Sequence, residues 1–361
     1  MQLNILVLPG DGIGTEVTRE AVRVLERVAT RYGHTLKLSE GLLGGVAIHK
    51  TGQPMPDETA RLAQDADATL MGAVGLPEFD NAPPAQRPER GLLGIRTILG
   101  VYANLRPVRT YAALIDSSPL KNHLVEGTDM IIVRELTGGI YYGTPRGITG
   151  EAPNEHAVNT MAYSRHEIDR IARMAFELAS KRRKKVSSVD KSNVLETSQL
   201  WRKVVTEVAA DYPGVELEHI LVDNCAMQLV LNPRRFDVVV TENMFGDILS
   251  DEGSVLAGSI GMLPSASIGA RRPSGKWVGL YEPVHGSAPD IAGQNKANPL
   301  GAIGSVAAML EYSFGLMEEA AAVNRAMEEV LNSGHVTADL RPKGTPATTG
   351  QVGQAVCEAI G

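Results

Sequence analysis

The sequence contains few cysteines and no long apolar run. Its only two cysteines, Cys225 and Cys357, do not stand in a metal-binding spacing. A disulfide framework is therefore excluded, and we expect a reducing compartment, the cytoplasm. No stretch approaches the ~18 uninterrupted apolar residues that a membrane span needs. The N-terminal residues lack the basic start and the long apolar run of a secretory signal.

The sequence also lacks an excess of basic residues. It holds 35 Lys and Arg against 42 Asp and Glu, which gives a formal net charge of −7. A nucleic-acid-binding domain carries a basic patch or a high pI. We therefore expect no nucleic-acid partner, and without a membrane span we expect no membrane partner.

The sequence does contain short apolar runs that alternate with helical patterns. Its 361 residues, 43% of them hydrophobic, allow about two domains of ~150 residues each. We predict strands at 5–8, 68–74, 130–134, 186–189 and 237–242. We predict helices at 16–31, 91–100, 164–182 and 196–210, and through nearly all of 299–334. The Gly- and aromatic-rich segment 137–150 is predicted to be an extended arm or hairpin. This alternation favours the α/β class.

One glycine-rich turn near the N-terminus is similar to a dinucleotide fingerprint, but its spacing differs. Gly10, Gly12 and Gly14 lie between a predicted strand and a predicted helix. The third glycine comes one position early, and no well-placed acidic residue follows a second strand ~20 residues later. We therefore predict a plain tight turn and a non-Rossmann fold.

Two aspartates give the strongest chemical signal. Asp247 and Asp251 are four residues apart, so their side chains project from one face of a helical turn. Mg²⁺ and Mn²⁺ favour carboxylate oxygens and keep positions open for a substrate. Asp223 follows the apolar run 219–222, where it would stand at the end of a strand. We predict a metal site with Asp223 as the third ligand.

Basic and phenolic side chains indicate an acidic substrate and proton transfer. Arg96, Arg106 and Arg134 lie near predicted element ends, and their planar guanidinium groups suit bidentate capture of carboxylates. Singly, each is more often a surface ion pair, but together with the metal pair they suggest a di- or tricarboxylate. Lys191, just after a predicted strand, is a candidate base. Tyr141 is a candidate proton donor.

The segment 282–291 is a loop of small residues with one imidazole, His285, and one carboxylate, Asp290. Such a loop can approach a nucleotide closely through its backbone N–H groups.

Together these segments resemble the isocitrate/isopropylmalate dehydrogenase family of β-decarboxylating dehydrogenases, which act on malate-type (R)-2-hydroxy acids. The resemblance runs from Gly10 to Gly353. Leu92 and Leu93 stand where the isocitrate enzymes carry a Ser/Asn pair, so the chain looks like the isopropylmalate branch. Burying a branched alkyl group is worth roughly 1.5–3 kcal/mol, whereas a carboxylate against two leucines is strongly disfavoured.

The resemblance implies a role for each candidate residue. The substrate would be bound by Glu89, Leu92, Leu93, Arg96, Arg106, Arg134, Asn193, Val194 and Asp223. Mg²⁺ or Mn²⁺ would be held by Asp247 and Asp251 together with Asp223 of the other subunit, and K⁺ is a candidate activator. Lys191, also from the other subunit, would take the hydroxyl proton. Tyr141 would protonate C3 after CO₂ has left.

The resemblance also implies NAD⁺ as the cofactor. Its contacts would come from Glu282, His285, Gly286, Ser287, Ala288, Asp290, Ile291 and Asn298. NADP-dependent relatives carry Lys and Tyr at the positions of Asp290 and Ile291. A carboxylate at position 290 accepts hydrogen bonds from ribose hydroxyls and repels a 2′-phosphate.

The implied fold is a two-domain, non-Rossmann α/β fold with a dimer arm. A discontinuous cofactor-binding domain would comprise 1–101 and 258–361. A dimerisation and metal/substrate domain would comprise 102–257, and its arm 137–150 would pair with a second copy in a homodimer with shared active sites.

The implied reaction is the NAD-dependent oxidative decarboxylation of (2R,3S)-3-isopropylmalate to 4-methyl-2-oxopentanoate and CO₂ in leucine biosynthesis. The same chemistry on a benzylmalate, a methylthioalkylmalate or D-malate stays open, although Leu92 and Leu93 argue against bare malate. A catalytically silent regulatory subunit is disfavoured, because it should have lost metal or base residues. Here Lys191, Tyr141 and all three aspartates are present.

Overall fold

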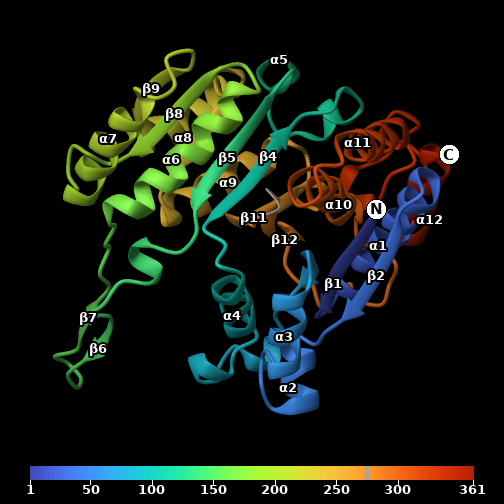
Figure 1. Ribbon diagram of the computed structural model, residues 1–361, viewed down its shortest axis with the longest axis horizontal. Helices are drawn as coiled ribbons and strands as arrows, with labels where there is room; N and C mark the ends of the chain where they lie inside the picture. Colours follow the sequence, from blue (N-terminus) through green and yellow to red (C-terminus); the bar gives the residue numbers. More distant parts are fainter. Residues whose placement is uncertain (273–275) are drawn as a thin grey trace. The chain divides into compact units, whose positions relative to one another are not determined.

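The chain folds into two compact units (Figure 1). A computed structural model describes residues 1–272 and 276–361. The first unit contains Met1–Val101, Thr110–Pro119 and Ala257–Gly361, and the second contains Tyr102–Arg109 and Leu120–Leu256. Each unit is a sheet with helices on both faces, so the predicted α/β class is confirmed. No helix in the described part of the chain has both the length and the apolar character that crossing a bilayer requires.

The sheet of the first unit has the strand order β2-β1-β3-β12-β11. Its strands are β1 (Gln2–Gly10), β2 (Thr35–Glu40), β3 (Ala68–Ala73), β11 (Pro264–Arg271) and β12 (Trp277–Pro283). β1 runs parallel to β2 and β3, whereas β11 and β12 are antiparallel. All six residues of β3 are buried, as expected for a central strand that is covered on both faces.

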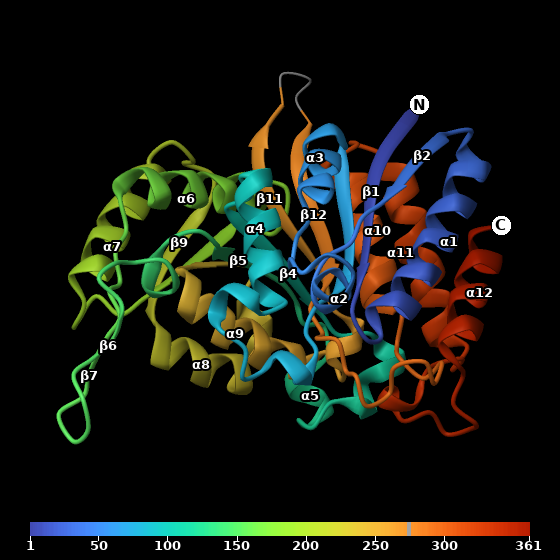
Figure 2. The ribbon, with the colours of Figure 1, turned by 90° about the horizontal axis from the view of Figure 1, so that it is seen from below.

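Two layers of helices cover this sheet. On one face lie α1 (Gly14–Tyr32), α10 (Leu300–Tyr312), α11 (Met317–Asn332) and α12 (Thr349–Ile360); on the other lie α2 (Gly45–Thr51), α3 (Asp57–Asp65) and α4 (Glu89–Leu99) (Figure 2). Short 3₁₀ turns occur at Pro77–Phe79, Pro84–Gln86, Ala112–Ser117, Ile260–Met262 and Ala338–Leu340. The prediction that nearly all of 299–334 is helical is confirmed by α10 and α11. The chain turns between α10 and α11, where Gly315 adopts a φ of 68°, which a side chain disfavours.

The sheet of the second unit has the strand order β4-β5-β10-β8-β9. Its strands are β4 (Ala103–Arg109), β5 (Asp129–Glu135), β8 (Lys185–Asp190), β9 (Glu216–Leu221) and β10 (Val238–Thr241). Among the pairings described between these five strands, only β4–β5 is antiparallel. The helices α6 (Arg165–Ser180) and α7 (Glu196–Ala209) lie on one face and α8 (Val222–Leu231) and α9 (Asn243–Leu256) on the other (Figures 1 and 2). The remaining elements are α5 (Asn122–Val125) and the 3₁₀ turns Gly139–Tyr141 and Pro233–Arg235.

Two boundaries differ from prediction in this unit. The arm is a hairpin of β6 (Gly147–Thr149) and β7 (His156–Val158), so it continues past residue 150. β9 ends at Leu221, and Val222 already begins α8. Asp223 therefore lies in the first turn of a helix and not at the end of a strand. Aspartate favours the first turn because of the positive end of the helix dipole.

The helix predicted from residue 164 begins with a capping box, which generates a test. Ser164 Oγ accepts a hydrogen bond from Glu167 N, and the Glu167 carboxylate accepts one from Ser164 N at 2.7 Å. Ser164→Ala should lower the free energy of unfolding by about 1 kcal/mol. Glu167 N loses its acceptor, and the reciprocal hydrogen bond from Ser164 N to the Glu167 carboxylate is weakened. Urea denaturation measures this. Ser180→Ala is the control, since Ser180 Oγ donates to the carbonyl of Phe176 in the same helix and does not cap its start. Equal stabilities of the two variants would contradict the prediction.

Candidate active site

The first cluster of predicted residues forms around the start of α9 in the second unit. Asp247 and Asp251 lie one turn apart on this helix, and their side chains are 37% and 63% exposed. Residues four apart share a helix face, so both carboxylates are accessible from one side, as predicted from their spacing.

Arg134 reaches this helix from the end of β5. In the parallel register of β10 and β5, Thr241 pairs with Arg134, which brings the guanidinium beside the first turn of α9. There it forms an ion pair with Asp247, and Asn243 Oδ1 accepts hydrogen bonds from Arg134 Nε at 3.0 Å and Nη2 at 2.8 Å. A Cβ at Gly246 would lie 2.6 Å from Arg134 Cγ. Only glycine at position 246 therefore leaves room for this side chain.

Arg106 approaches the same carboxylates from β4. Its Nη1 donates to Asp251 Oδ1 at 3.1 Å and to Ser250 Oγ at 2.7 Å, and its Nη2 lies 3.9 Å from Asp247 Oδ1. Two positively charged arginines and two negatively charged aspartates thus lie next to one another in one cluster. Such a cluster can bind an acidic ligand through the arginines and a cation through the aspartates.

Tyr141 completes this cluster. Its hydroxyl donates to Asp247 Oδ2 at 3.0 Å. Burial, followed by the hydrogen bond to Asp247 and the charge of that carboxylate, raises the pKa of Tyr141 above its ordinary value. The phenol therefore holds its proton at neutral pH and can donate it.

Lys191 and Asp223 form a separate pair. Lys191 follows β8, and its Nζ donates to Asp223 Oδ1 at 2.5 Å. This hydrogen bond is the main reason that the pKa of Asp223 is lowered. Asn193 and Val194 lie exposed in the same turn, Val194 at 61%. Within the described residues, no group of three His, Cys, Asp or Glu side chains is arranged to hold a metal ion, so one chain does not bring Asp223 together with Asp247 and Asp251.

The predicted specificity residues lie on α4 in the first unit. Arg96 Nη2 donates to Glu282 Oε1 at 2.8 Å, and both side chains are largely buried. Leu92 and Leu93 are half-buried. Leu92 packs against a core cluster that includes Leu43, Met71 and Ile95, so part of its surface serves the core. Glu89 begins the helix.

The predicted cofactor loop follows β12. His285 is buried; its Nδ1 lies 2.9 Å from Gly286 O, and its Nε2 has no hydrogen-bond partner among the described residues. Ala288 takes a φ of 37°, which is uncommon for a residue with a side chain. Asp290 is exposed and Ile291 half-buried. Asn298 is used internally, because it donates to Asp339 Oδ2 and accepts from Leu300 N.

The N-terminal glycine turn proves to support this loop, which the sequence did not reveal. Ile13 N donates to Ser287 O at 2.8 Å, and a Cβ at Gly12 would lie 2.1 Å from that same oxygen. Asp11 is buried and accepts hydrogen bonds from Gly45 N, Val46 N and Gly75 N. The turn is tight, as predicted, but it also joins three backbone segments. The sequence signal that could have revealed this role is Asp11 between two glycines, because the small size of glycine permits another backbone segment to approach closely.

The comparisons with known proteins agree with this arrangement. Residues 4–356 match the sequence model of the family described as isocitrate/isopropylmalate dehydrogenase. A 3-isopropylmalate dehydrogenase of Geobacillus kaustophilus is 60% identical over 340 residues, covering 94% of this chain and 90% of the relative. One from Halalkalibacterium halodurans is 55% identical and covers 100% of this chain and 98% of the relative. A crystal structure of isocitrate dehydrogenase from Methylococcus capsulatus superposes with a TM-score of 0.87 at 34% identity, covering 99% of both chains.

This chain belongs to the isocitrate/isopropylmalate dehydrogenase family. The resemblance and the fold that were inferred from the sequence are thereby confirmed, and the chain is an oxidoreductase.

The buried histidine of the cofactor loop gives a pH-dependent prediction. Burial lowers the pKa of His285 below its ordinary value of 6.5, and burial likewise lowers that of His219 in the second unit. The unfolded chain therefore binds protons at a higher pH than the folded chain does. The contribution of the two neutral histidines to the free energy of unfolding should be fully present above about pH 6.5 and should be lost as the pH drops below it.

We expect the free energy of unfolding to decrease between about pH 7.5 and pH 5.5, as measured by urea denaturation across this range. His285→Asn should make this decrease smaller, because the variant has no imidazole to protonate. His166→Asn, at an exposed position, is the control and should keep the slope of the unchanged protein. If the free energy of unfolding of His285→Asn depended on pH as steeply as that of the unchanged protein, the prediction would be wrong.

Proposed function

We propose that this chain oxidises and decarboxylates (2R,3S)-3-isopropylmalate to 4-methyl-2-oxopentanoate and CO₂, with NAD⁺ as the oxidant, as a step of leucine biosynthesis. The observation that carries the proposal is the environment of Asp247, whose carboxylate meets Arg106, Arg134 and Tyr141 together. Relatives that are named 3-isopropylmalate dehydrogenase and share up to 60% of the sequence support the substrate.

The residues of the second unit fit a hard divalent cation. Asp247 and Asp251 offer accessible carboxylate oxygens on one face of α9, which is the donor chemistry of Mg²⁺ or Mn²⁺. Asp223 of a second copy would be the third ligand. The bound ion supplies charge stabilisation for oxygen atoms that become negative during the reaction. K⁺ would act as an additional activator.

The residues of the first unit fit NAD⁺. The unpartnered Nε2 of buried His285 is an acceptor in the neutral tautomer and calls for a donor from a ligand. Gly286 is open to solvent, and nothing lies within 4 Å of the place of a Cβ. Exposed Asp290 would accept from ribose hydroxyls and repel the 2′-phosphate of NADP⁺. When bound, NAD⁺ would supply the two-electron oxidant for C2 of the substrate. The remaining cofactor contacts would come from Glu282, Ser287, Ala288, Ile291 and Asn298.

The chain's own residues would then bind the substrate and move two protons. Arg96, Arg106 and Arg134 would hold the two carboxylates, with Glu89, Asn193 and Asp223 around them. Lys191 would accept the hydroxyl proton while C2 loses its hydride. The bond from C3 to its carboxyl carbon then breaks, CO₂ leaves, and the electron pair remains at C3. Tyr141, whose raised pKa keeps its proton in place, would protonate C3. Leu92, Leu93 and Val194 would line the space for the isopropyl group.

A homodimer with shared sites belongs to the same proposal. α8 carries Asp223 together with Met227, Val230 and Leu231, whose side chains are 55%, 38% and 60% exposed. α9 carries the metal carboxylates together with Ile248 and Val255, which are 60% and 49% exposed. Burying these apolar side chains favours association. A second copy that packs on this face would bring its Asp223 and Lys191 toward Asp247 and Asp251, a set that one described chain does not assemble.

Each unit would have its own task in this arrangement. Residues 1–101 and 258–361 would bind the cofactor, and 102–257 would bind metal and substrate and form the dimer. The hairpin arm would pair with that of the second copy. Its Ile148 is 76% exposed, which fits a contact of this kind.

The first test is a substrate and cofactor panel. NADH formation should be fastest, in kcat/KM, on 3-isopropylmalate with Mn²⁺ or Mg²⁺ and K⁺, by roughly ten- to hundredfold over D-malate, because burying the alkyl group is worth roughly 1.5–3 kcal/mol. Leu93→Ala should reduce kcat/KM on 3-isopropylmalate and leave that on D-malate nearly unchanged. NADP⁺ should be the poorer oxidant. A preference for benzylmalate, a methylthioalkylmalate or D-malate would overturn the substrate, and no turnover of any of them would overturn the function.

Subunit mixing tests the shared site. Lys191→Ala and Asp247→Asn should each be inactive alone. After random re-association, half of the dimers are mixed and each has one intact site of two, so activity should return to about a quarter of the unchanged protein. Asp247→Asn mixed with Asp251→Asn is the matched control. Each site takes both of these carboxylates from one chain, and every chain in this mixture carries one of the two changes, so no intact site forms. Absence of recovery in the first mixture would show that the site is not shared.

A further inference from the structure

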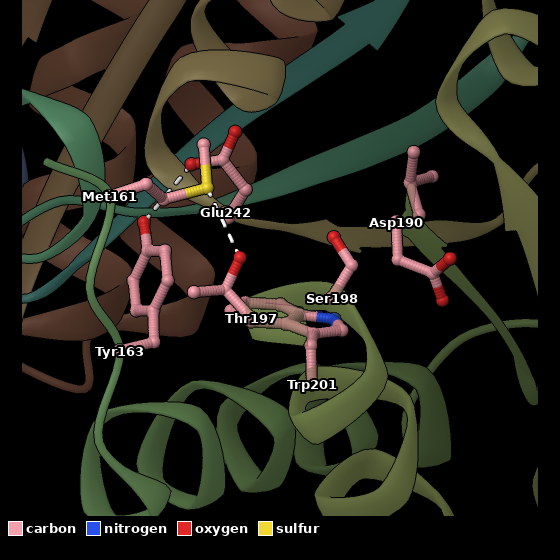
Figure 3. Close-up of a pocket in the computed structure, with 8 residues that line it drawn as sticks. Met161, Tyr163, Asp190, Thr197, Ser198, Trp201 and Glu242 are labelled. Atoms are coloured by element: carbon pink, nitrogen blue, oxygen red, sulfur yellow. Dashed lines mark hydrogen bonds between the residues drawn. The ribbon is translucent and has the colours of Figure 1, made fainter. Parts of the chain in front are cut away.

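Tyr163 donates a hydrogen bond to Glu242, and both side chains line a small cavity (Figure 3). The cavity is lined by Glu242 and by residues of β8, α7 and the chain before α6, among them Met161, Thr197, Ser198 and Trp201. Its free volume of about 10 Å³ is at the lower limit for a single water molecule. The cavity is therefore too small for a substrate or an effector. Its lining residues matter through their hydrogen bonds and packing with neighbouring residues.

The Glu242 carboxylate holds the first turn of α9. It accepts hydrogen bonds from Phe245 N at 2.7 Å and from Met244 N at 3.1 Å. These are two of the N–H groups that a helix start leaves without an intrahelical partner. Glu242 is 4% exposed, so water does not replace these bonds. Its carboxylate thereby fixes where the helix of Asp247 and Asp251 begins.

The Tyr163 hydroxyl joins this cap to Asn243. It donates to Glu242 Oε2 at 3.1 Å and accepts from Asn243 N at 3.0 Å. The side chain of Asn243 in turn accepts from Arg134 and donates to Gly138 O at 3.1 Å. The Tyr163 hydroxyl is thus connected to Arg134 through Asn243, which bonds the hydroxyl with its backbone N–H and Arg134 with its side chain. The hydroxyl itself contacts no group that would touch a substrate.

The ring of Tyr163 supports the turn that carries Tyr141. A Cβ at Gly139 would lie 2.4 Å from Tyr163 Oη, and one at Gly138 would lie 2.7 Å from the ring. Gly139 N donates to Ala162 O at 3.1 Å. On another side, Trp201 packs edge-on against the ring with 5.8 Å between centroids, and its Nε1 donates to Ser188 Oγ. The ring is therefore held between the body of the unit and the root of the arm.

We infer that Tyr163, acting with Glu242, is a positioning residue that sets the geometry of Tyr141, Arg134 and Asp247. This inference rests on the proposed function for its kinetic consequences. The single side chain of Tyr163 contacts both the turn before Tyr141 and the cap of α9. Without its hydroxyl, the first turn of α9 and the turn 139–141 lose their common partner, and the hydrogen bond between Tyr141 and Asp247 loses its fixed length.

Tyr163→Phe tests the inference, because it removes the hydroxyl and keeps the packed ring. We expect kcat on 3-isopropylmalate to fall by about tenfold or more, since a shift near 1 Å in a catalytic group can cost about 10²-fold. The KM for NAD⁺ should stay within about twofold, because the cofactor loop belongs to the other unit. Tyr212→Phe is the matched control: Tyr212 stacks on Phe176, and its loss of a hydroxyl should leave kcat unchanged. An equal fall in both variants, or no fall in Tyr163→Phe, would overturn the inference.

A binding measurement separates this inference from the proposed function. Mn²⁺ alone, titrated into the dimer and followed by electron paramagnetic resonance, should bind about tenfold more weakly to Tyr163→Phe, because Asp247 and Asp251 are displaced. If the unchanged protein turns over no malate, the proposed function fails, yet this titration still reports the positioning. Equal Mn²⁺ affinity of the variant and the unchanged protein would overturn the positioning role.

Substitutions of Glu242 provide the comparison if Tyr163→Phe folds poorly. Glu242→Gln keeps one carbonyl oxygen for Phe245 N, and its amide can donate to the Tyr163 hydroxyl. Glu242→Ala loses every bond of the cap. The glutamine variant should therefore retain most of kcat and of the Mn²⁺ affinity, while the alanine variant loses at least about tenfold in both. Equal losses in the two variants would contradict the proposed geometry.

Discussion

The buried guanidinium of Arg134 is the constraint on which the arrangement of the second unit depends. The residue is 5% exposed, and a buried charge without partners is strongly destabilising. Its partners are Asn243 and Asp247, one helical turn apart on α9, with Gly246 between them leaving space for the side chain. The helix must therefore begin at this place and in this rotation, and its start fixes where Asp247 and Asp251 present their oxygens.

The first unit is organised by a comparable buried charge of the opposite sign. Asp11, just after β1, accepts hydrogen bonds from two backbone N–H groups of the chain after β2 and from one of the chain after β3, and the residues beside it contact Ser287. Asp11, Arg134 and Lys191 lie at or just after the carboxyl ends of parallel strands, where open α/β sheets bind ligands. A charge that is satisfied by backbone donors lets irregular loops keep one conformation close to a binding surface.

The sequence predicted the α/β class, most element positions and the chemistry of the α9 stretch, because these depend on local spacing. The four-residue separation of Asp247 and Asp251 gave their common helix face, and Ser164 gave the start of α6. The errors lie where several conformations fit the same local pattern. The run 219–222 reads as a strand up to Val222, yet the helix begins there.

The sequence by itself therefore determined which chemical groups are present and which of them share a helix or follow a strand. Only the tertiary structure decided which groups meet: that Arg106 and Arg134 share Asp247, that Lys191 pairs with Asp223, and that Arg96 is matched by Glu282. It also decided the parts played by Asp11, Tyr163 and Glu242, which no local motif marks. The physical reason is that burial and pairing of charge depend on segments far apart in the chain, and their register is set by sheet pairing and packing.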